Sequence, residues 1–421
     1  MTYKEAMEYI EEIGKKGSVL GLGPVTELLK RLDNPQEKLS VIHVAGTNGK
    51  GSICTFLEAM YRAEGKRVGR YISPTLHCYL ERIQIDGKYI EEENFAHLLS
   101  KAKDRITDMV REGFAIPTAF EVETVIAFLY FVKEKVDLVV LETGMGGRED
   151  ATNVISKPLC TVFASVGMDH MQFLGDSLEK ISYEKAGIIK DRCPVVSYPN
   201  RKEVLEVLEK EAILHSTKID VVLPEKILIL NEDIHGSSFL YKDVEYTISM
   251  AGEYQIYNAV TAIETKLLLD GKVDACSLHN AKWEGRFEIV SENPFILKDG
   301  AHNVDGADAL KKSMEKHFTN RKKIYIIGVL EDKEYEKMMA ILCPMAVDIF
   351  TITPPGKRGL SACVLRDCIR SYCNHVTACV NVEQALQYAQ MAYEEYEAAG
   401  EEAVIVAWGS LSYIGQIVSK E

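Results

Sequence analysis

The sequence predicts an α/β protein of two domains, on the evidence of its length, its composition and the periodicity of its apolar residues. The chain has 421 residues, more than one hydrophobic core usually serves, so two domains are expected. Hydrophobic residues make up 47% and charged residues 27% of the chain, which is typical of a globular protein. Apolar β-branched runs alternate with helical patterns, as in a largely parallel sheet that is covered by helices on both faces.

Each predicted strand is an apolar run without a polar face. The predicted strands cover residues 41–45, 136–141, 159–165, 194–197, 323–328, 347–353 and 403–407. The clearest helical periodicity between them covers residues 52–63, 121–134 and 177–186.

A different pattern, of short alternating runs, covers residues 227–230, 238–241 and 244–249. It predicts a small antiparallel section of hairpins. A second alternating α/β unit begins near Pro294, and the segment before it is predicted to separate the units. We therefore expect domains of residues 1–294 and 295–421, the second smaller and Rossmann-like.

Charge and cysteine usage exclude several classes of protein. The net charge of −14 argues against binding to nucleic acid, which needs a basic surface. The chain starts with an amphipathic helix pattern instead of a signal peptide, and no apolar run approaches the roughly 20 residues that span a membrane. We expect a cytoplasmic monomer. Four cysteines near His375 lack a C-x₂-C pair, so they are predicted to be small buried hydrophobes and not zinc ligands: Cys363, Cys368, Cys373 and Cys379.

A glycine-rich segment, 46–52, lies between the first predicted strand and a helix. Its glycines allow backbone N–H groups to surround an anion, and the helix N-terminus adds the positive end of a dipole. Lys50 supplies a full charge for the phosphates of ATP, and the Ser52 hydroxyl can approach the phosphates or their Mg²⁺. The first domain is thus predicted to be of the P-loop ATPase type. The predicted nucleotide ligands in this loop are Thr47, Asn48, Gly49, Lys50, Gly51 and Ser52.

A carboxylate, Glu142, ends another apolar strand and precedes a loop rich in glycine. The carboxyl ends of strands in an open α/β sheet are where ligands bind. Because a hard oxygen ligand suits Mg²⁺, Glu142 is a candidate metal ligand.

These segments resemble the motifs of the folylpolyglutamate synthase and dihydrofolate synthase branch of the Mur ligase family. The resemblance covers roughly residues 17–415, and Gly51 after Lys50 distinguishes this branch from the usual P-loop pattern. The matching motifs are A-G-T-N-G-K-G-S at 45–52, L-E-x-G-x-G-G-R-x-D-A-T-N at 141–153, D-H at 169–170, E-K-A-G-I at 184–188, G-x-x-Q-x-x-N-A at 252–259, W-x-G-R-x-E at 283–288 and D-G-A-H-N at 299–303.

The resemblance implies an ATP-dependent ligase that adds L-glutamate to a folate carboxylate through an acyl phosphate. It implies two Mg²⁺ ions, one held by Ser73 and Glu142 and the other by Glu142 and His170. It also implies that Lys185 is carbamylated, and that Lys50, Lys185 and His302 act in catalysis.

Further binding residues follow from the same resemblance. Asn258, Arg286 and Asp299 are expected to contact the nucleotide. The residues expected to contact the acid substrate are Gly21, Leu22, Gly23, Phe120, Gly147 and Arg148.

Two other functions stay open from the sequence. One is a Mur-type ligase that acts on a cell-wall precursor, and the other is a P-loop ATPase switch without ligase activity. Within the folate branch, the acceptor could be dihydropteroate, a reduced folate or both.

Overall fold

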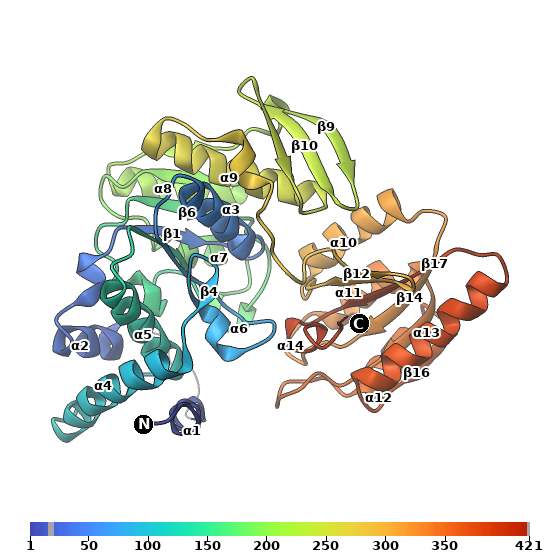
Figure 1. The fold of residues 1–421 in the computed structure, drawn as a ribbon, viewed down its shortest axis with the longest axis horizontal. Helices are drawn as coiled ribbons and strands as arrows, with labels where there is room; N and C mark the ends of the chain where they lie inside the picture. The colour runs from blue at the N-terminus through green and yellow to red at the C-terminus, as the bar shows by residue number, and fades with distance from the viewer. Residues whose placement is uncertain (16–20, 419–421) are drawn as a thin grey trace. The chain divides into compact units, whose positions relative to one another are not determined.

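The computed structural model describes residues 1–15 and 21–418 and divides into two compact units (Figure 1). The first unit contains Met1–Pro74, Cys78–Lys226 and Tyr257–Leu278. The second contains Thr75–His77, Ile227–Ile256 and the chain from His279 onward.

The first unit is built on an eight-stranded sheet with the order β4-β3-β2-β5-β1-β6-β7-β8. All pairs from β2 to β8 are parallel, whereas β3 and β4 form an antiparallel edge. The strands are β1 (Val41–Ala45), β2 (Val68–Tyr71), β3 (Ile83–Ile85), β4 (Lys88–Tyr89), β5 (Leu138–Glu142), β6 (Cys160–Phe163), β7 (Val195–Ser197) and β8 (Ile219–Val221).

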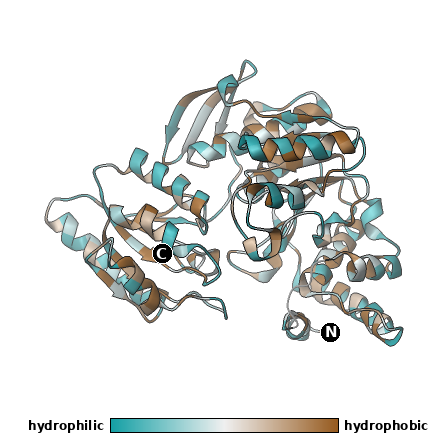
Figure 2. Ribbon diagram, turned by 180° about the vertical axis from the view of Figure 1, so that it is seen from behind, coloured by the Kyte–Doolittle hydropathy of each residue, from teal (hydrophilic) through white to brown (hydrophobic). Residues whose placement is uncertain are grey.

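Helices cover this sheet, and the strands β1, β2, β5 and β6 are buried along their whole length. Along the helices, hydrophilic and hydrophobic residues lie side by side (Figure 2), as expected for helices with one face toward a core. The helices are α1 (Tyr3–Gly14), α2 (Gly23–Arg31), α3 (Lys50–Ala63), α4 (Glu92–Arg111), α5 (Ala119–Lys133), α6 (Met171–Leu174), α7 (Leu178–Ala186), α8 (Lys202–Leu214) and α9 (Glu253–Asp270), with 3₁₀ turns η1 (Pro35–Lys38), η2 (Tyr79–Arg82), η3 (Ala151–Val154), η4 (Pro224–Lys226) and η5 (Ala275–Leu278).

The second unit contains a six-stranded sheet of order β12-β13-β17-β14-β15-β16 and a three-stranded antiparallel sheet of order β11-β10-β9. The strands are β9 (Ile227–Asp233), β10 (Gly236–Tyr241), β11 (Val244–Ile248), β12 (Glu288–Glu292), β13 (Phe295–Asp299), β14 (Lys322–Ile327), β15 (Ala346–Thr351), β16 (Val376–Ala378) and β17 (Ala403–Trp408). The helices are α10 (Val304–His317), α11 (Tyr335–Leu342), α12 (Ala362–Ile369), α13 (Val382–Ala398) and α14 (Leu411–Ile414), with the 3₁₀ turn η6 (Cys343–Met345).

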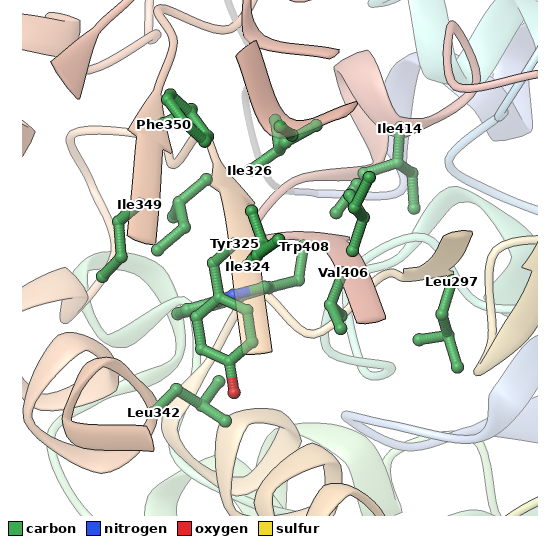
Figure 3. Close-up of a cluster of buried hydrophobic side chains, with 14 of the residues drawn as sticks. Leu297, Ile324, Tyr325, Ile326, Leu342, Ile349, Phe350, Val406, Trp408 and Ile414 are labelled. Carbon is green, nitrogen blue, oxygen red and sulfur yellow. The ribbon is translucent and has the colours of Figure 1, made fainter. Parts of the chain in front are cut away.

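Aromatic side chains lie among aliphatic ones in the core of the six-stranded sheet (Figure 3). Trp408 and Tyr325 are both buried, and their rings meet edge to face with centroids 6.0 Å apart. Aliphatic side chains from β13, β14, β15 and β17 surround them. All ten cysteines are free thiols. Cys373 and Cys379 lie in this core as predicted, but the prediction is wrong for Cys363, which is exposed, and Cys368 is only partly buried.

The predicted fold class is confirmed, including the small antiparallel section. The predicted strand 41–45 coincides with β1, and the predicted helices 52–63 and 121–134 overlap α3 and α5. The compact units, however, divide the chain at other places than residue 294. The predicted separator contains β12, which pairs antiparallel with β13 (Glu292 opposite Phe295) and so belongs to the second sheet.

Candidate active site

Four neighbouring strands of the first unit, β2, β5, β1 and β6, end at the same edge of the sheet. They are parallel and in register, with Tyr71 opposite Leu141, Val44 opposite Glu142 and Ala45 opposite Phe163. The phosphate loop, Ser73, Glu142 and His170 all lie at or shortly after these strand ends. The topology therefore gathers the predicted ATP and metal residues at one edge, where open α/β sheets bind ligands.

The phosphate loop connects β1 to α3, as predicted. Gly49 has φ +87°, a left-handed conformation that favours glycine, and α3 begins at the next residue without a side-chain cap. Thr47 ties the loop to the end of β6, because its hydroxyl donates to the Gly167 carbonyl oxygen and accepts from the Gly167 N–H, both at 3.1 Å. The Thr47 N–H also donates to the Ser165 carbonyl oxygen at 2.7 Å. These bonds fix the loop at the N-terminus of α3, which suits an anion.

Lys50 lies between the loop and the end of β5. Its Nζ is 3.3 Å from the carbonyl oxygen of Thr47 and 3.7 Å from Oε1 of Glu142. Glu142 is buried, whereas Lys50 is partly exposed. Lys50 therefore places a positive charge next to the position of a phosphate bound at the loop.

The predicted metal residues combine a hydroxyl, a carboxylate and an imidazole. Ser73, two residues past β2, is half-buried, and His170 has a left-handed φ of 50° and is the N-cap of the short helix α6. Within residues 1–15 and 21–418, no group of three or more His, Cys, Asp and Glu side chains could hold a metal ion. Ser73 is a hydroxyl ligand and belongs to none of these residue types, so this ligand set stays a prediction.

Lys185, near the end of α7, is buried against the phosphate loop. Its Nζ donates to the Gly46 carbonyl oxygen at 2.8 Å. Burial, followed by the positive charge of Lys50, lowers the pKa of Lys185 to about 7. A large part of the amine is therefore neutral near neutral pH, the form in which an amine is a nucleophile.

The glycine loop after Glu142 interlocks with the end of α7. A Cβ on Gly147 would lie 2.6 Å from the Lys185 carbonyl oxygen, and a Cβ on Gly187 would lie 2.4 Å from Cα of Arg148. Arg148 donates its N–H to the Glu184 carbonyl oxygen at 2.7 Å. Two of the motifs therefore need glycine because their backbones touch.

The Arg148 side chain is engaged within the protein. Its Nη2 is 2.8 Å from Oε1 of Glu211, and its guanidinium lies over the Tyr183 ring at 4.0 Å. These contacts favour a structural role over the predicted contact with substrate. The close packing of Gly147 favours the same conclusion for that residue.

A buried polar network behind the loop was not predicted. Asp150 accepts from the Thr152 hydroxyl at 2.5 Å and from the Met145 N–H at 2.8 Å, and Nε2 of His43 lies 2.8 Å from the Thr152 oxygen. Burial lowers the pKa of His43 to about 3, so the imidazole is neutral. Through His43, the network attaches the loop that follows Glu142 to strand β1. The D-A-T-N motif was the signal in the sequence, but spacing alone cannot pair it with His43.

Asn258 lies in α9 and is buried. A Cβ on Gly49 would come within 2.5 Å of its Oδ1. The structure therefore brings this predicted nucleotide ligand to the phosphate loop.

Three further predicted residues belong to the second unit. A Cβ on Gly300 would lie 1.7 Å from Nη1 of Arg286, so the arginine occupies the space that this glycine leaves. Asp299 is buried and accepts from the N–H groups of Phe287 and Ala301, both at 2.8 Å. Burial raises the pKa of Asp299 despite the nearby positive charge of Arg286. The Asp299 carboxylate thus connects the W-x-G-R and D-G-A-H-N motifs by hydrogen bonds.

His302 follows in the same loop, and its Nδ1 lies 2.7 Å from the Gly300 carbonyl oxygen. If Nδ1 carries the proton and donates there, Nε2 of a neutral ring is the acceptor nitrogen. The contact fixes the orientation of the imidazole.

Two segments predicted to contact the acid substrate lie close together. Gly21 and Leu22 lead into α2, and Phe120 lies in the first turn of α5. Sequence reasoning assigned no role to the buried Glu121, which joins these two helices by accepting from the Val25 N–H at 3.2 Å. The spacing of Thr118 and Glu121, a capping box, was the signal that could have indicated it.

Two domain models of one protein family match most of the chain. Residues 44–265 match the Mur ligase middle domain, and residues 285–411 match the glutamate ligase domain of the Mur ligases. The chain is 36% identical over 353 residues to the dihydrofolate synthase/folylpolyglutamate synthase of Bacillus subtilis, which covers 80% of this chain and 82% of that protein.

Solved structures are similar over nearly the whole chain. Folylpolyglutamate synthase of Mycobacterium tuberculosis, complexed with ADP and AMPPCP, has a TM-score of 0.91 at 27% identity and covers 98% of this chain and 97% of its own. A folylpolyglutamate synthase in complex with AMPPCP and folate has a TM-score of 0.82 at 26% identity, covering 99% of this chain and 98% of its own.

The fold, the phosphate loop and the matched domains together define a Mur ligase, and the chain belongs to the Mur ligase family. Its similarities lie in the branch of dihydrofolate synthases and folylpolyglutamate synthases. In the part of the chain that the structure describes, no helix is long and apolar enough to cross a membrane.

Proposed function

We propose that this chain is an ATP-dependent ligase that joins the amino group of L-glutamate to a carboxylate of a folate. The observation that carries the proposal is Lys50, which lies at the N-terminus of α3 and 3.7 Å from the buried Glu142 at the ligand-binding edge of the sheet. The reported relatives are named for folate substrates, which supports this acid over a cell-wall precursor and over an ATPase switch.

The reaction has two steps. An oxygen of the substrate carboxylate attacks the γ-phosphorus of ATP, the bond to the β–γ bridging oxygen breaks, and ADP leaves an acyl phosphate behind. The amine of glutamate then attacks the acyl carbon and loses a proton, and phosphate departs as the amide forms. Since charge spreads over the phosphoryl oxygens in the first step, Lys50 and the N–H groups at the start of α3 stabilise it.

The residues at the strand ends fit Mg²⁺ in part. Ser73 and Glu142 offer hard oxygen ligands from neighbouring strands, which suits the ion, whereas the imidazole of His170 is a less usual ligand. Bound Mg²⁺ would neutralise phosphate charge. We assign Ser73 and Glu142 to one ion, and Glu142 and His170 to a second.

Carbamylation of Lys185 is part of this proposal. The neutral amine attacks the carbon of CO₂: the N–C bond forms, one C=O π bond breaks with its electron pair going to oxygen, and the nitrogen loses a proton, so a carboxylate-like anion takes the place of the amine. The pKa of about 7 supports it, because the amine must be neutral to react. Incorporation of ¹³C-bicarbonate, seen as a carbamate signal by NMR in the wild type and lost in Lys185→Met, tests it. An intact mass and spectrum of a bare amine in CO₂-saturated buffer would sink it.

In the second unit, Arg286 and Asp299 are proposed to serve the nucleotide, and His302 the transferring phosphate. Since both Asp299 oxygens already accept backbone N–H groups, its contribution includes holding Arg286 in place. The protein is expected to be monomeric, which sedimentation velocity measures directly.

Phosphate release tests the proposed function. Release should require ATP, a folate acid and L-glutamate together, with a product heavier by one glutamate residue. Parallel assays with dihydropteroate and with tetrahydrofolate, read by mass spectrometry, identify the acceptor. Turnover that is independent of the acid and of glutamate would instead indicate an ATPase.

A further inference from the structure

One buried carboxylate, that of Glu121, joins the N-termini of two helices. Oε2 accepts from the N–H of Thr118, the N-cap of α5, at 2.6 Å, and Oε1 accepts from the N–H of Val25 at 3.2 Å. Val25 is the third residue of α2. Glu121 is only 4% exposed, so water does not replace these bonds.

Both helices need this acceptor. The N-cap of α2 is Leu22, which has no side-chain hydrogen bond to offer, so the first N–H groups of α2 depend on another part of the chain. In α5, Thr118 and Glu121 form a capping box. Helix N-termini carry partial positive charge, which a carboxylate also stabilises.

Two N–H donors, those of Thr118 and Val25, require a carboxylate as their shared acceptor. One N–H donor belongs to Thr118, the N-cap of the helix that contains Glu121, and the other to Val25 of α2, and an ionised carboxylate accepts at both oxygens. A glutamine of the same shape would turn its NH₂ group toward one of those N–H donors. One of the two hydrogen bonds would then be lost, because the glutamine NH₂ group and a backbone N–H, both donors, would face each other.

The segments that Glu121 connects are those predicted to bind the acid. Gly21 and Leu22 lead into α2, which begins at Gly23, and Phe120 directly precedes Glu121. The Phe120 ring also packs against the loop after β5, since a Cβ on Gly144 would lie 2.4 Å from its Cζ. The carboxylate therefore holds two parts of the acid site in one arrangement beside the end of β5.

We propose that Glu121 is a positioning residue for the acid substrate, which fixes residues 21–23, at the start of α2, relative to Phe120. The proposal rests on the proposed function, since it needs an acid that binds at these segments. A merely structural role would instead lower stability and change the affinities for the acid and for ATP alike.

Glu121→Gln is the test, and Glu5→Gln is its matched control. Glu5 makes the same capping box at α1, with Oε2 accepting from the Thr2 N–H at 2.7 Å, but it is exposed and joins no second helix. Steady-state KM is measured for the acid and for ATP in each variant. Hydrogen exchange of the peptide that covers α2 reports on the Val25 amide.

In Glu121→Gln, the KM for the acid should rise about tenfold, as expected for the loss of one buried charge-assisted hydrogen bond. The KM for ATP should stay within about twofold, and α2 should exchange faster. Glu5→Gln should change none of these. If Glu121→Gln does not fold, Glu121→Asp, which keeps both oxygens on a shorter side chain, carries the test with the same expectation.

An unchanged KM for the acid, or equal increases for the acid and ATP, would overturn the positioning role. A wild-type protein that shows no acid-dependent phosphate release fails the proposed function instead. The two failures are therefore separate results of one experiment.

Discussion

The amine of Lys185 donates to the carbonyl oxygen of Gly46 at 2.8 Å, so the lysine of the E-K-A-G-I motif lies directly beneath the phosphate loop. Lys185 and Gly46 are far apart in the sequence, yet they are joined by this hydrogen bond. The same contact buries the amine next to Lys50 and lowers its pKa. The phosphate loop and the E-K-A-G-I motif, which are separate in the sequence, therefore form one site.

Lys50→Ala should lower ligase turnover by about 10²–10³-fold, because it removes a charge that stabilises the transferring phosphoryl group. Phosphate release at saturating ATP measures the loss. Lys210→Ala, at an exposed position of α8, is the control and should retain wild-type turnover. Full activity of Lys50→Ala would remove the phosphate loop from the mechanism.

The ionisation of Lys185 should make stability depend on pH. Its pKa is lowered from 10.5 to about 7 in the folded protein, so above pH 7 the unfolded chain binds the proton and the folded protein does not. Stability then rises with pH, by up to about 1.4 kcal/mol per pH unit, and this contribution is lost as pH falls toward 7.

Denaturant unfolding in CO₂-free buffer between about pH 7.5 and 9 measures this slope. Lys185→Met should flatten the slope, since methionine has no proton to bind. Lys180→Met, at an exposed lysine of the same helix, should leave it unchanged. Equal slopes in the wild type and Lys185→Met would contradict the lowered pKa.

Asp299→Asn should destabilise the protein by about 1–3 kcal/mol, because an amide cannot accept from both the Phe287 and Ala301 N–H groups. The KM for ATP should rise as well, since Arg286 is held by the same turn. Asp308→Asn, exposed on α10, is the control for the loss of one charge. Wild-type stability in Asp299→Asn would mean that these two bonds contribute little.

Gly147→Ala should cost about 1–3 kcal/mol, because the new Cβ would meet the Lys185 carbonyl oxygen at 2.6 Å. The displacement of α7 should also lower activity. Gly14→Ala has open space around the added Cβ and should not destabilise. Thermal unfolding compares the two, and equal midpoints would show that the loop and α7 can separate without cost.

Much of the fold could be predicted because its signals are local. Apolar runs gave β1 and β14 to within a residue, and the glycine loop between a strand and a helix indicated the phosphate site. Segment 284–294 was different: β12 is only partly buried, so it carries no continuous apolar run, and its pairing with β13 is a tertiary contact.

The sequence by itself determined the family, the phosphate loop and the set of motifs, since these depend on residue types at fixed spacings. The tertiary structure alone decided what those residues touch. Arg148 pairs with Glu211, Asp299 accepts two backbone N–H groups, and Glu121 joins two helices. The physical reason is that hydrogen bonding and burial, and with them the pKa of Lys185, depend on neighbours that are distant along the chain.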